Sequence, residues 1–441
     1  MAKLAVVLAG GGSRGAYQVG VWQALRELGV DYQIVTGTSV GALNGAMMAQ
    51  GDYETARQLW ENLVTTDVVK ADLPTEPPDY DDPRWQTEVW SVFIKKAIQD
   101  GGLDFSPLEG LMARYTSEER IRASEVDFGV VTVEYPSLRP LELSRAQMPK
   151  GQLIDYVVAS AACFPAFKAK EIDGGKYIDG GYQDNMPVNL ALDMGAEEIV
   201  AVDLKSVGIR RRPKDSTVPM RLIRSRWDLG PFLLFEPTLS RRNIRLGYLD
   251  TMKAFGKLDG DWYAFNEGEW AGRIALLEEH MHALYNLLTQ GSREPLARAG
   301  RQRLLRTLEL GKASAGAPEA MVMPAAELAG KLLRLDNQAC WSCEEYDRQL
   351  LAAFEAAESS AREAVARITT GEGVFARLGE ILGRERQQVL LSIVYALLCR
   401  ALEGSDPAGD FWRLSLAAPA ELAASVYLWL LRSEAAGGGE P

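Results

Sequence analysis

Near its N-terminus the chain reads KLAVVLAGGGSRG from Lys3 to Gly15. Lys3–Ala9 is a continuous apolar run, which is typical of a strand in a parallel sheet covered on both faces. After the glycines a helix is expected over about 14–28, because apolar residues recur there on one face. A second strand over Tyr32–Thr36 leads through a tight turn into a helix that ends near Ala49. Strands and helices that alternate at this spacing predict an open α/β sheet.

The character of the sequence changes after about residue 270. A further buried strand is expected at Glu198–Leu204. From Gly272 onward Ala, Leu, Arg and Glu dominate, with helical periodicity and no strand pattern. We therefore predict an α/β domain over residues 1–268, followed by an all-α domain of unknown role over residues 269–441.

Bulk composition narrows the classes of protein and of site. The net charge of −12 argues against broad nucleic-acid binding, which needs a basic surface. Cys340 and Cys343 are spaced C-x-x-C, but a zinc site would have to recruit the distant Cys163 and Cys399 or the two histidines. We expect reduced thiols and no bound metal.

Membrane-spanning segments are not expected. The longest apolar runs near the C-terminus, Val389–Cys399 and Val426–Leu431, fall below the roughly 18–20 residues needed to cross a bilayer. The apolar run at the N-terminus is too short for a secretory signal. We expect a cytoplasmic protein whose contact with membranes, if it makes any, is peripheral.

The segment Gly37-Thr38-Ser39-Val40-Gly41 fits the G-x-S-x-G pattern of a nucleophile elbow. It lies where a predicted strand passes into a predicted helix, which is the context that this motif requires. A serine on such a sharp turn needs neighbours without Cβ atoms, as Gly37 and Gly41 are. Ser39 is the candidate nucleophile, and the alternative is a turn serine that caps a helix.

A nucleophilic serine needs a base, and histidine is the usual one. The chain has only His280 and His282, both in the helical region. A carboxylate is therefore the expected base, and Asp179 is the best candidate. It follows a short predicted strand and precedes Gly180 and Gly181, so no bulky neighbour crowds its carboxylate.

Two other aspartates compete with this choice. Asp173 begins a second Asp-Gly-Gly between two short predicted strands, where Asp-Gly is a preferred hairpin turn, so we interpret it as structural. Asp203 lies at the end of a buried strand and is a weaker rival, for which a strand-end cap is the simpler interpretation.

Consecutive glycines after the first strand let several backbone N–H groups point into one space at the start of a helix. Such donors would stabilise the oxyanion of a tetrahedral intermediate. The residues of this candidate oxyanion hole are Gly10, Gly11, Gly12, Arg14 and Gly15. The same segment fits the dinucleotide fingerprint G-x-G-x-x-G, but the second strand ends in Thr36-Gly37-Thr38-Ser39, without the acidic residue that holds a ribose.

Together these motifs resemble the patatin-like phospholipase family. The resemblance lies in G-G-G-x-R-G at the N-terminus, in G-T-S-x-G, and in D-G-G-x-x-x-N-x-P, whose fixed positions are Asp179, Gly180, Gly181, Asn185 and Pro187. It extends over about residues 1–265 and includes Ala159–Pro165. It implies a three-layer α/β/α sandwich with a mostly parallel sheet, a Ser39–Asp179 dyad, and hydrolysis of lipid acyl esters without metal or cofactor.

Other functions stay open at this point. The same residues would serve an acyltransferase or a hydrolase of small esters. Because the glycine loop also fits the dinucleotide fingerprint, a dinucleotide-binding oxidoreductase is an alternative function. The α/β domain could also be a weak esterase whose helical partner domain binds a protein. Arg14 is expected to orient the glycine loop or to meet a phosphate.

A basic segment suggests how the protein reaches lipid. Arg210–Trp227 concentrates arginines and lysines beside apolar residues. One interpretation is a solvated loop whose arginines pair with acidic side chains elsewhere. The hypothesis is a surface that docks on anionic membranes, where each cation contributes about 1 kcal/mol.

Overall fold

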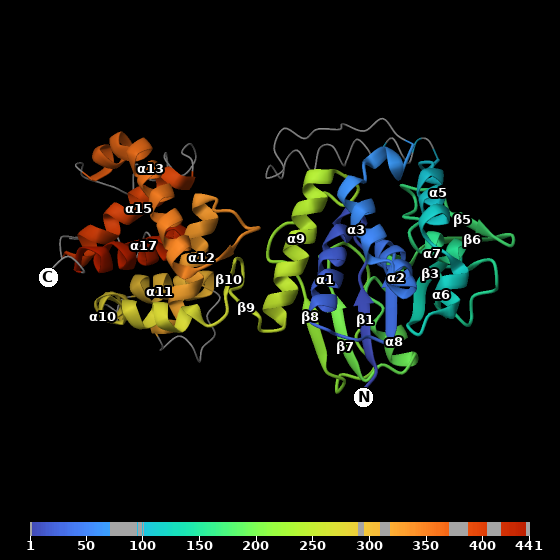
Figure 1. Cartoon of the computed structure of the whole chain (residues 1–441). Coiled ribbons are helices and arrows are strands. Elements are labelled where there is room, and N and C mark those ends of the chain that lie inside the picture. Colours follow the sequence, from blue (N-terminus) through green and yellow to red (C-terminus); the bar gives the residue numbers. More distant parts are fainter. Residues whose placement is uncertain are drawn as a thin grey trace. The chain divides into compact units, whose positions relative to one another are not determined.

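The computed structural model describes residues 2–70, 95, 99, 101–289, 295–308, 318–369, 387–403 and 416–437. The chain divides into two compact units, Met1–Phe255 and Gly256–Pro441, which are treated separately below (Figure 1). The division comes earlier than the boundary we predicted after residue 268. Two short strands at 258–266 pair within the second unit, which assigns them to it.

The first unit is built on an eight-stranded, mostly parallel sheet, as the sequence predicted (Figure 1). The strand order is β5-β6-β3-β2-β1-β7-β8, and β4 pairs with β3. Strands β4 and β8 were not predicted from the sequence. The strands are β1 Leu4–Leu8, β2 Ile34–Thr38, β3 Asp127–Tyr135, β4 Pro140–Ser144, β5 Lys170–Ile172, β6 Gly175–Asp179, β7 Glu198–Val202 and β8 Met220–Ile223.

Strand β3 is the junction between the parallel and antiparallel parts of this sheet. Its residues 127–131 pair with β2 in parallel, and its residues 132–135 pair with β6 antiparallel. Strand β4 pairs with residues 129–133 of β3, along the opposite edge of β3. Strands β2 and β6 therefore follow one another along the same edge of β3, and their C-terminal ends meet there.

Helices cover both faces of the sheet, which gives the predicted three-layer sandwich. Alternate residues of β1 enter two separate cores. Val6 and Leu8 belong to the larger core, with helices α1, α2 and α9, whereas Ala5 and Val7 face α8. The helices are η1 Gly12–Gly15, α1 Ala16–Glu27, α2 Val40–Gln50, α3 Tyr53–Asn62, η2 Thr65–Asp67, α5 Ser106–Tyr115, α6 Glu118–Ala123, α7 Leu153–Ser160, η3 Gly180–Tyr182, α8 Val188–Asp193 and α9 Pro237–Ala254.

The second unit is helical, as predicted, and adds a small sheet that the sequence did not predict. The strands of this sheet lie in the order β11-β10-β9. Their bounds are β9 Leu258–Asp259, β10 Ala264–Asn266 and β11 Cys340–Trp341. The buried Glu327 accepts backbone N–H bonds from Asp261, Trp262 and Tyr263 at 2.8 to 3.0 Å. The helices are α10 Glu269–Thr289, α11 Pro295–Thr307, η5 Pro318–Met321, α12 Val322–Leu333, α13 Cys343–Thr369, α15 Gln387–Leu402 and α17 Pro419–Gly437.

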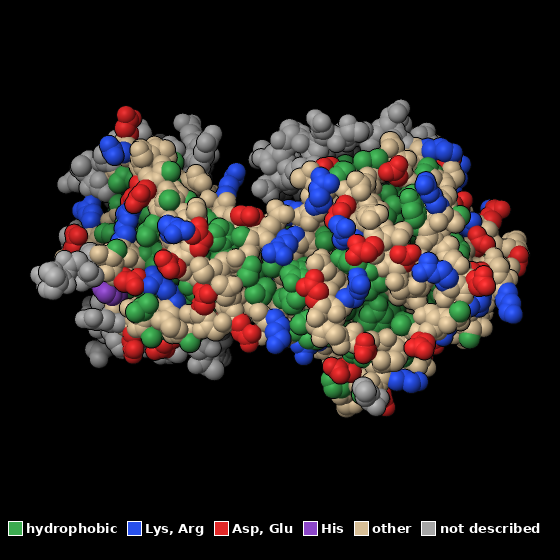
Figure 2. All heavy atoms as spheres, viewed as in Figure 1, with side chains coloured by type: hydrophobic (Ala, Val, Ile, Leu, Met, Phe, Trp, Pro, Cys, Tyr) green, Lys and Arg blue, Asp and Glu red, His purple; other side chains and the backbone are tan. Residues whose placement is uncertain are grey.

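Two surface properties bear on the expectations above. Among the described residues, no helix combines the length and apolar character that crossing a bilayer requires. On the face drawn in Figure 2, acidic and basic side chains of the described residues are interspersed in each unit, so that face carries no broad basic surface.

Helices α1 and α9 lie close together because each presents a glycine to the other's backbone (Figure 1). A Cβ on Gly20 would lie 1.8 Å from the carbonyl oxygen of Ile244. A Cβ on Gly247 would lie 2.0 Å from the carbonyl oxygen of Tyr17. This packing needs glycine on both helices, since backbone atoms cannot move aside as a flexible side chain can.

We predict that Gly20→Ala lowers the free energy of unfolding by about 1–3 kcal/mol or more, because α1 and α9 must separate. Denaturant unfolding measures the change. Gly110→Ala is the matched control: this exposed glycine in α5 has no atom within 4 Å of an added Cβ. That variant should gain up to about 1 kcal/mol from helix propensity. Equal stability of the two variants would contradict the glycine contact.

Candidate active site

The elbow at Ser39 is a strained turn between β2 and α2. Ser39 has φ 55° and ψ −128°, a conformation that non-glycine residues rarely adopt and that costs on the order of 1–3 kcal/mol. A Cβ on Gly37 would lie 2.1 Å from the carbonyl oxygen of Gly41, and one on Gly41 would lie 2.2 Å from that of Leu8. Both predicted elbow glycines are therefore required by close backbone contacts.

The register of β3 brings Asp179 to this elbow. Thr38, the last residue of β2, pairs with Val131, and Asp179, the last residue of β6, pairs with the next residue, Thr132. The backbone N–H of Asp179 also donates to the carbonyl of Ala162, 2.9 Å away. Ser39, directly after β2, and Asp179, at the end of β6, are 140 positions apart in sequence and thus reach the same point in space.

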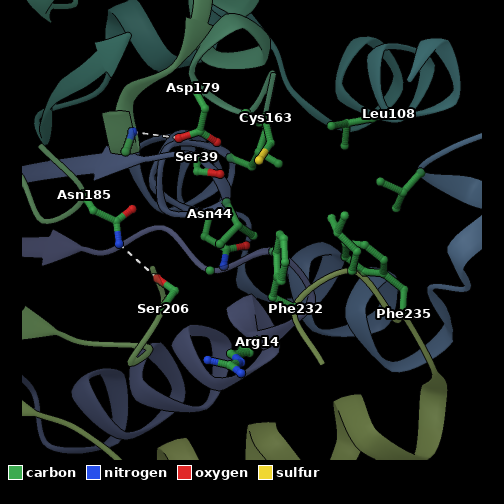
Figure 3. A pocket seen from close by; sticks show the side chains of 18 of the residues that line it. Arg14, Ser39, Asn44, Leu108, Cys163, Asp179, Asn185, Ser206, Phe232 and Phe235 are labelled. Carbon is green, nitrogen blue, oxygen red and sulfur yellow. Dashed lines mark hydrogen bonds between the residues drawn. The ribbon is translucent and has the colours of Figure 1, made fainter. Parts of the chain in front are cut away.

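Asp179 is buried beside Ser39 (Figure 3). Burial raises the pKa of this carboxyl to about 6. The neighbouring Ser39 side chain and the backbone N–H of Gly181, which donates to the carboxylate at 2.7 Å, both oppose that rise. The carboxylate is therefore a stronger base than a solvated aspartate, and it lies beside the Ser39 side chain.

The glycine loop divides into lining and packing positions. Gly11 and Gly12 line the cavity that holds Ser39 and Asp179, and in the described part of the chain their N–H groups have no protein acceptor. Gly12 has φ 57°, and its Cβ would lie 1.7 Å from the carbonyl oxygen of Phe232.

Gly10 and Gly15 serve packing instead. The N–H of Gly10 donates to the carbonyl of Asn185 at 3.0 Å. A Cβ on Gly15 would lie 2.4 Å from the side chain of Val40. These two positions hold the loop against its neighbours rather than presenting a donor to the cavity.

Arg14 ties the glycine loop to neighbouring segments. Its Nε donates to the carbonyl of Gly230 at 2.7 Å, and its Nη1 to the carbonyl of Lys205 at 3.1 Å. Burial lowers the pKa of this guanidinium, and the charge of Asp228 opposes the shift. In Figure 3 Arg14 lies apart from Ser39 and Asp179. These contacts favour the orienting role over a phosphate contact.

Sequence reasoning assigned no role to Ser160, which contacts the elbow directly. This wholly buried hydroxyl accepts the backbone N–H of Ser39 at 2.9 Å and donates to the carbonyl of Val131 at 2.5 Å. It links the strained turn to β3. The only sequence signal was its position inside the Ala159–Pro165 segment.

A second residue without a predicted role, Asn185, joins the base segment to the glycine loop. Its side-chain amide donates to the carbonyl of Gly10 at 3.4 Å and to the hydroxyl of Ser206 at 2.9 Å. The Ser206 hydroxyl in turn donates to the carbonyl of Gly10. Asn185, Ser206 and Gly10 thus fix the entry to the glycine loop (Figure 3).

The rival aspartates lie elsewhere. Asp173 has φ 48° in an exposed hairpin turn between β5 and β6, as predicted, and accepts a hydrogen bond from Gln152. Asp203 is buried between Arg210, which donates two hydrogen bonds at 2.7 and 2.8 Å, and Arg224 at 3.0 Å. Its carboxylate also accepts the backbone N–H of Lys205 at 2.8 Å, so Asp203 caps the end of β7, as interpreted from the sequence, and forms ion pairs as well.

The basic segment is largely paired with acids, which favours the solvated-loop interpretation. In addition to the two arginines on Asp203, Arg211 pairs with Glu142 and Lys214 with Asp193. At least four of its seven basic residues are therefore paired locally, on three carboxylates.

A cavity of about 760 Å³ extends from the dyad between α2, α3 and α5. Trp60 and Phe235 stack in its wall, with ring centroids 6.0 Å apart. Its lining is mainly apolar and includes Leu43, Met47, Leu63, Leu108, Met112 and Phe232. A hydrocarbon chain fits such a lining, because it gains apolar burial without leaving polar groups unpaired.

Cys163 also lines this cavity. Burial, and secondarily the charge of Asp179, raise the pKa of its thiol to about 12, so it stays protonated and poorly nucleophilic at neutral pH. All four cysteines are free thiols. No group of three or more His, Cys, Asp or Glu side chains that could hold a metal occurs among the described residues.

Comparison with known proteins identifies the domain that carries this site. Residues 6–192 match the family model described as "Patatin-like phospholipase". This part of the chain is a patatin-like phospholipase domain. The first structural unit contains it, with the elbow, the base segment and the glycine loop all inside the matched residues.

Curated relatives share this domain and little else. Over 257 residues the chain is 28% identical to "Lysophospholipase nte1" of Aspergillus terreus (strain NIH 2624 / FGSC A1156), a match that covers 56% of this chain and 15% of that protein. Over 210 residues it is 30% identical to "Patatin-like phospholipase domain-containing protein 7" of Rattus norvegicus, covering 46% and 14%. The chain thus spans a small fraction of these relatives' length.

Among solved structures, VipD from Legionella pneumophila is similar over 97% of this chain and 92% of its own, with 15% identity and a TM-score of 0.37. A similarity of this level adds nothing to the assignment.

We predict that Ser160→Ala lowers kcat about tenfold or more with little change in KM. Without the hydroxyl, the buried N–H of Ser39 loses its acceptor, a change that typically costs about 1–3 kcal/mol. Steady-state kinetics on a chromogenic ester measures the effect. Ser160→Thr keeps the hydroxyl and should recover part of kcat. A full kcat in the alanine variant would show that the elbow does not depend on this bond.

Proposed function

We propose that the chain is a serine-dependent hydrolase of lipid acyl esters that uses a Ser39–Asp179 dyad. The observation that carries this proposal is the proximity of a serine on a strained elbow to a buried carboxyl of raised pKa, at the end of an apolar cavity. Burial, geometry and the chemistry of the lining all fit an acyl ester.

In the proposed reaction, Ser39 Oγ attacks the ester carbonyl carbon and its proton passes to Asp179. Backbone N–H groups of Gly11 and Gly12 would stabilise the oxyanion of the tetrahedral intermediate. The alcohol leaves with the proton from Asp179, and an acyl-serine remains. Water then gives a proton to Asp179 and adds to the acyl carbonyl. Collapse of this second intermediate breaks the bond to Ser39 Oγ, which takes the proton back from Asp179, and the fatty acid is released.

The raised pKa of Asp179 suits this role. A general base works best when its pKa lies near the working pH, and an ordinary aspartate is too weakly basic for a serine hydroxyl. At a pKa of about 6 the group is mostly ionised at neutral pH yet binds a proton more readily than a solvated carboxylate. No histidine has to take part.

The substrate class we propose is a single-chain lipid ester of the lysophospholipid kind. Several of the curated relatives that share this domain, among them the Aspergillus terreus protein, are named lysophospholipases, which supports a phosphodiester head group. The apolar cavity supports a long acyl chain. Transfer of the acyl group to another alcohol would use the same residues, with the alcohol in place of water.

We predict that Asp179→Asn abolishes ester hydrolysis, as Ser39→Ala does, because a side-chain amide cannot accept the serine proton. Asp173→Asn is the matched control: asparagine tolerates the same positive φ in a hairpin turn, so turnover should stay within a few-fold of the wild type. Hydrolysis of a lysophospholipid and labelling of Ser39 by a fluorophosphonate measure the two effects. Loss of hydrolysis in the Asp173→Asn variant, with hydrolysis kept in the Asp179→Asn variant, would refute the dyad.

We also predict that kcat/KM falls as the pH drops through about 6. Only the ionised Asp179 can accept the proton, so the rate should rise with pH and level off above its pKa of about 6. A pH–rate profile measures the midpoint. Burial raises the pKa of the nearby Asp184 to about 6 as well, so Asp184→Asn is the control and should leave the midpoint unchanged. A midpoint near 4 would contradict the burial of Asp179.

A further inference from the structure

The segment Lys205–Ile209, called the rim segment below, combines exposed apolar side chains with a fixed backbone. Val207 is 100% exposed and Ile209 is 53% exposed. Exposed apolar side chains on a loop are usually mobile, but this loop is held at Ile209. The N–H of Ile209 donates to the carbonyl of Gly181 at 2.9 Å, and the carbonyl of Ile209 accepts the N–H of Asn185 at 2.6 Å.

The rim segment borders the mouth of the substrate cavity. Val207 and Ile209 line the cavity, as does Tyr182, which follows the residue that holds Ile209. Tyr182 is also exposed, and so is Leu138, whose carbonyl accepts a hydrogen bond from the neighbouring Gln183. These four side chains form the rim cluster: Leu138, Tyr182, Val207 and Ile209. The rim cluster is an outward continuation of the apolar lining.

Positive charge lies at the base of the rim segment. Lys205 is exposed two residues before Val207, and its ammonium group donates to the carbonyl of Arg226 at 3.4 Å. Burial lowers the pKa of Lys205 first, and the nearby Arg224 and Arg226 lower it further. Cations therefore lie beside an apolar tip. In a bilayer the phosphates likewise lie outside the hydrocarbon, so the cations would meet the phosphates when the tip enters the hydrocarbon.

Among possible occupants of the rim cluster, a bilayer fits the observations better than a protein. A stable protein interface buries roughly 800 Å² on each partner, more than four apolar side chains supply. A lipid surface needs only a few inserted side chains with cations around them. It also supplies the substrate, whose acyl chain could pass from the bilayer into the cavity without crossing water.

We propose that the rim cluster inserts into the surface of a lipid bilayer and aligns the cavity mouth with the hydrocarbon, an inference that rests on the proposed function. Docking then depends on Val207, Ile209 and their neighbours more than on the arginines at 210–212, two of which are paired with acids.

Binding to phosphatidylcholine vesicles tests this proposal. The full chain carries Ser39→Ala in every sample so that lipid is not consumed, and co-sedimentation measures the bound fraction. Val207→Asp should weaken binding about tenfold, the loss expected for one inserted apolar side chain. Met220→Asp is the matched control: Met220 is 44% exposed and pairs with Ile199 at the opposite end of β7. It should bind like the parent.

Three outcomes overturn the proposal. They are no binding by the parent, equal binding by the Val207→Asp and Met220→Asp variants, and loss of binding only when Arg211 and Arg212 become serine. The Leu138→Asp variant separates docking from the cavity, because Leu138 does not line the cavity. Its vesicle binding should fall. With Ser39 intact, its hydrolysis of a short soluble ester should stay at the wild-type rate. If the wild type hydrolyses no ester, the proposed function fails, and the vesicle result still decides docking.

Discussion

The active-site geometry depends on the register of one strand, β3. Because β2 pairs with its first half and β6 with its second half along the same edge, the strand ends carrying Ser39 and Asp179 meet at Val131 and Thr132. A shift of one residue would turn every side chain of a strand to the other face of the sheet. The buried cores on both faces of the sheet oppose such a shift, so hydrophobic packing fixes the distance between the two polar groups.

Backbone proximity is the second condition for the site. The two elbow glycines and Gly12 lie where a backbone carbonyl oxygen approaches within about 2 Å of a would-be Cβ. Two separate hydrogen-bonded links hold these turns: Ser160 joins Ser39 to β3, and Asn185 joins the base segment to Gly10. The strain at Ser39 persists because these contacts determine the turn more strongly than its own backbone preference.

Burial of Asp179 makes its carboxylate more basic and lowers the stability of the folded protein at neutral pH. Its folded-state pKa of about 6 lies above the ordinary value of 3.8. Between those two pH values the folded protein keeps a proton that the unfolded chain has lost, so stability decreases as the pH rises through this window. The cost is on the order of 2–3 kcal/mol at neutral pH. The larger core of the first unit has to offset this cost.

The sequence by itself determined the α/β class, the elbow at Ser39, the turn role of Asp173 and the family, because these follow from local patterns of glycine, aspartate and apolar residues. Tertiary structure decided what depends on contacts between distant residues. It divided the glycine loop into lining and packing positions, brought Ser160 to the elbow, paired Asp203 with two arginines, and left Val207 exposed at the cavity mouth. No local pattern encodes these contacts, since each joins residues that meet only when the sheet has its register.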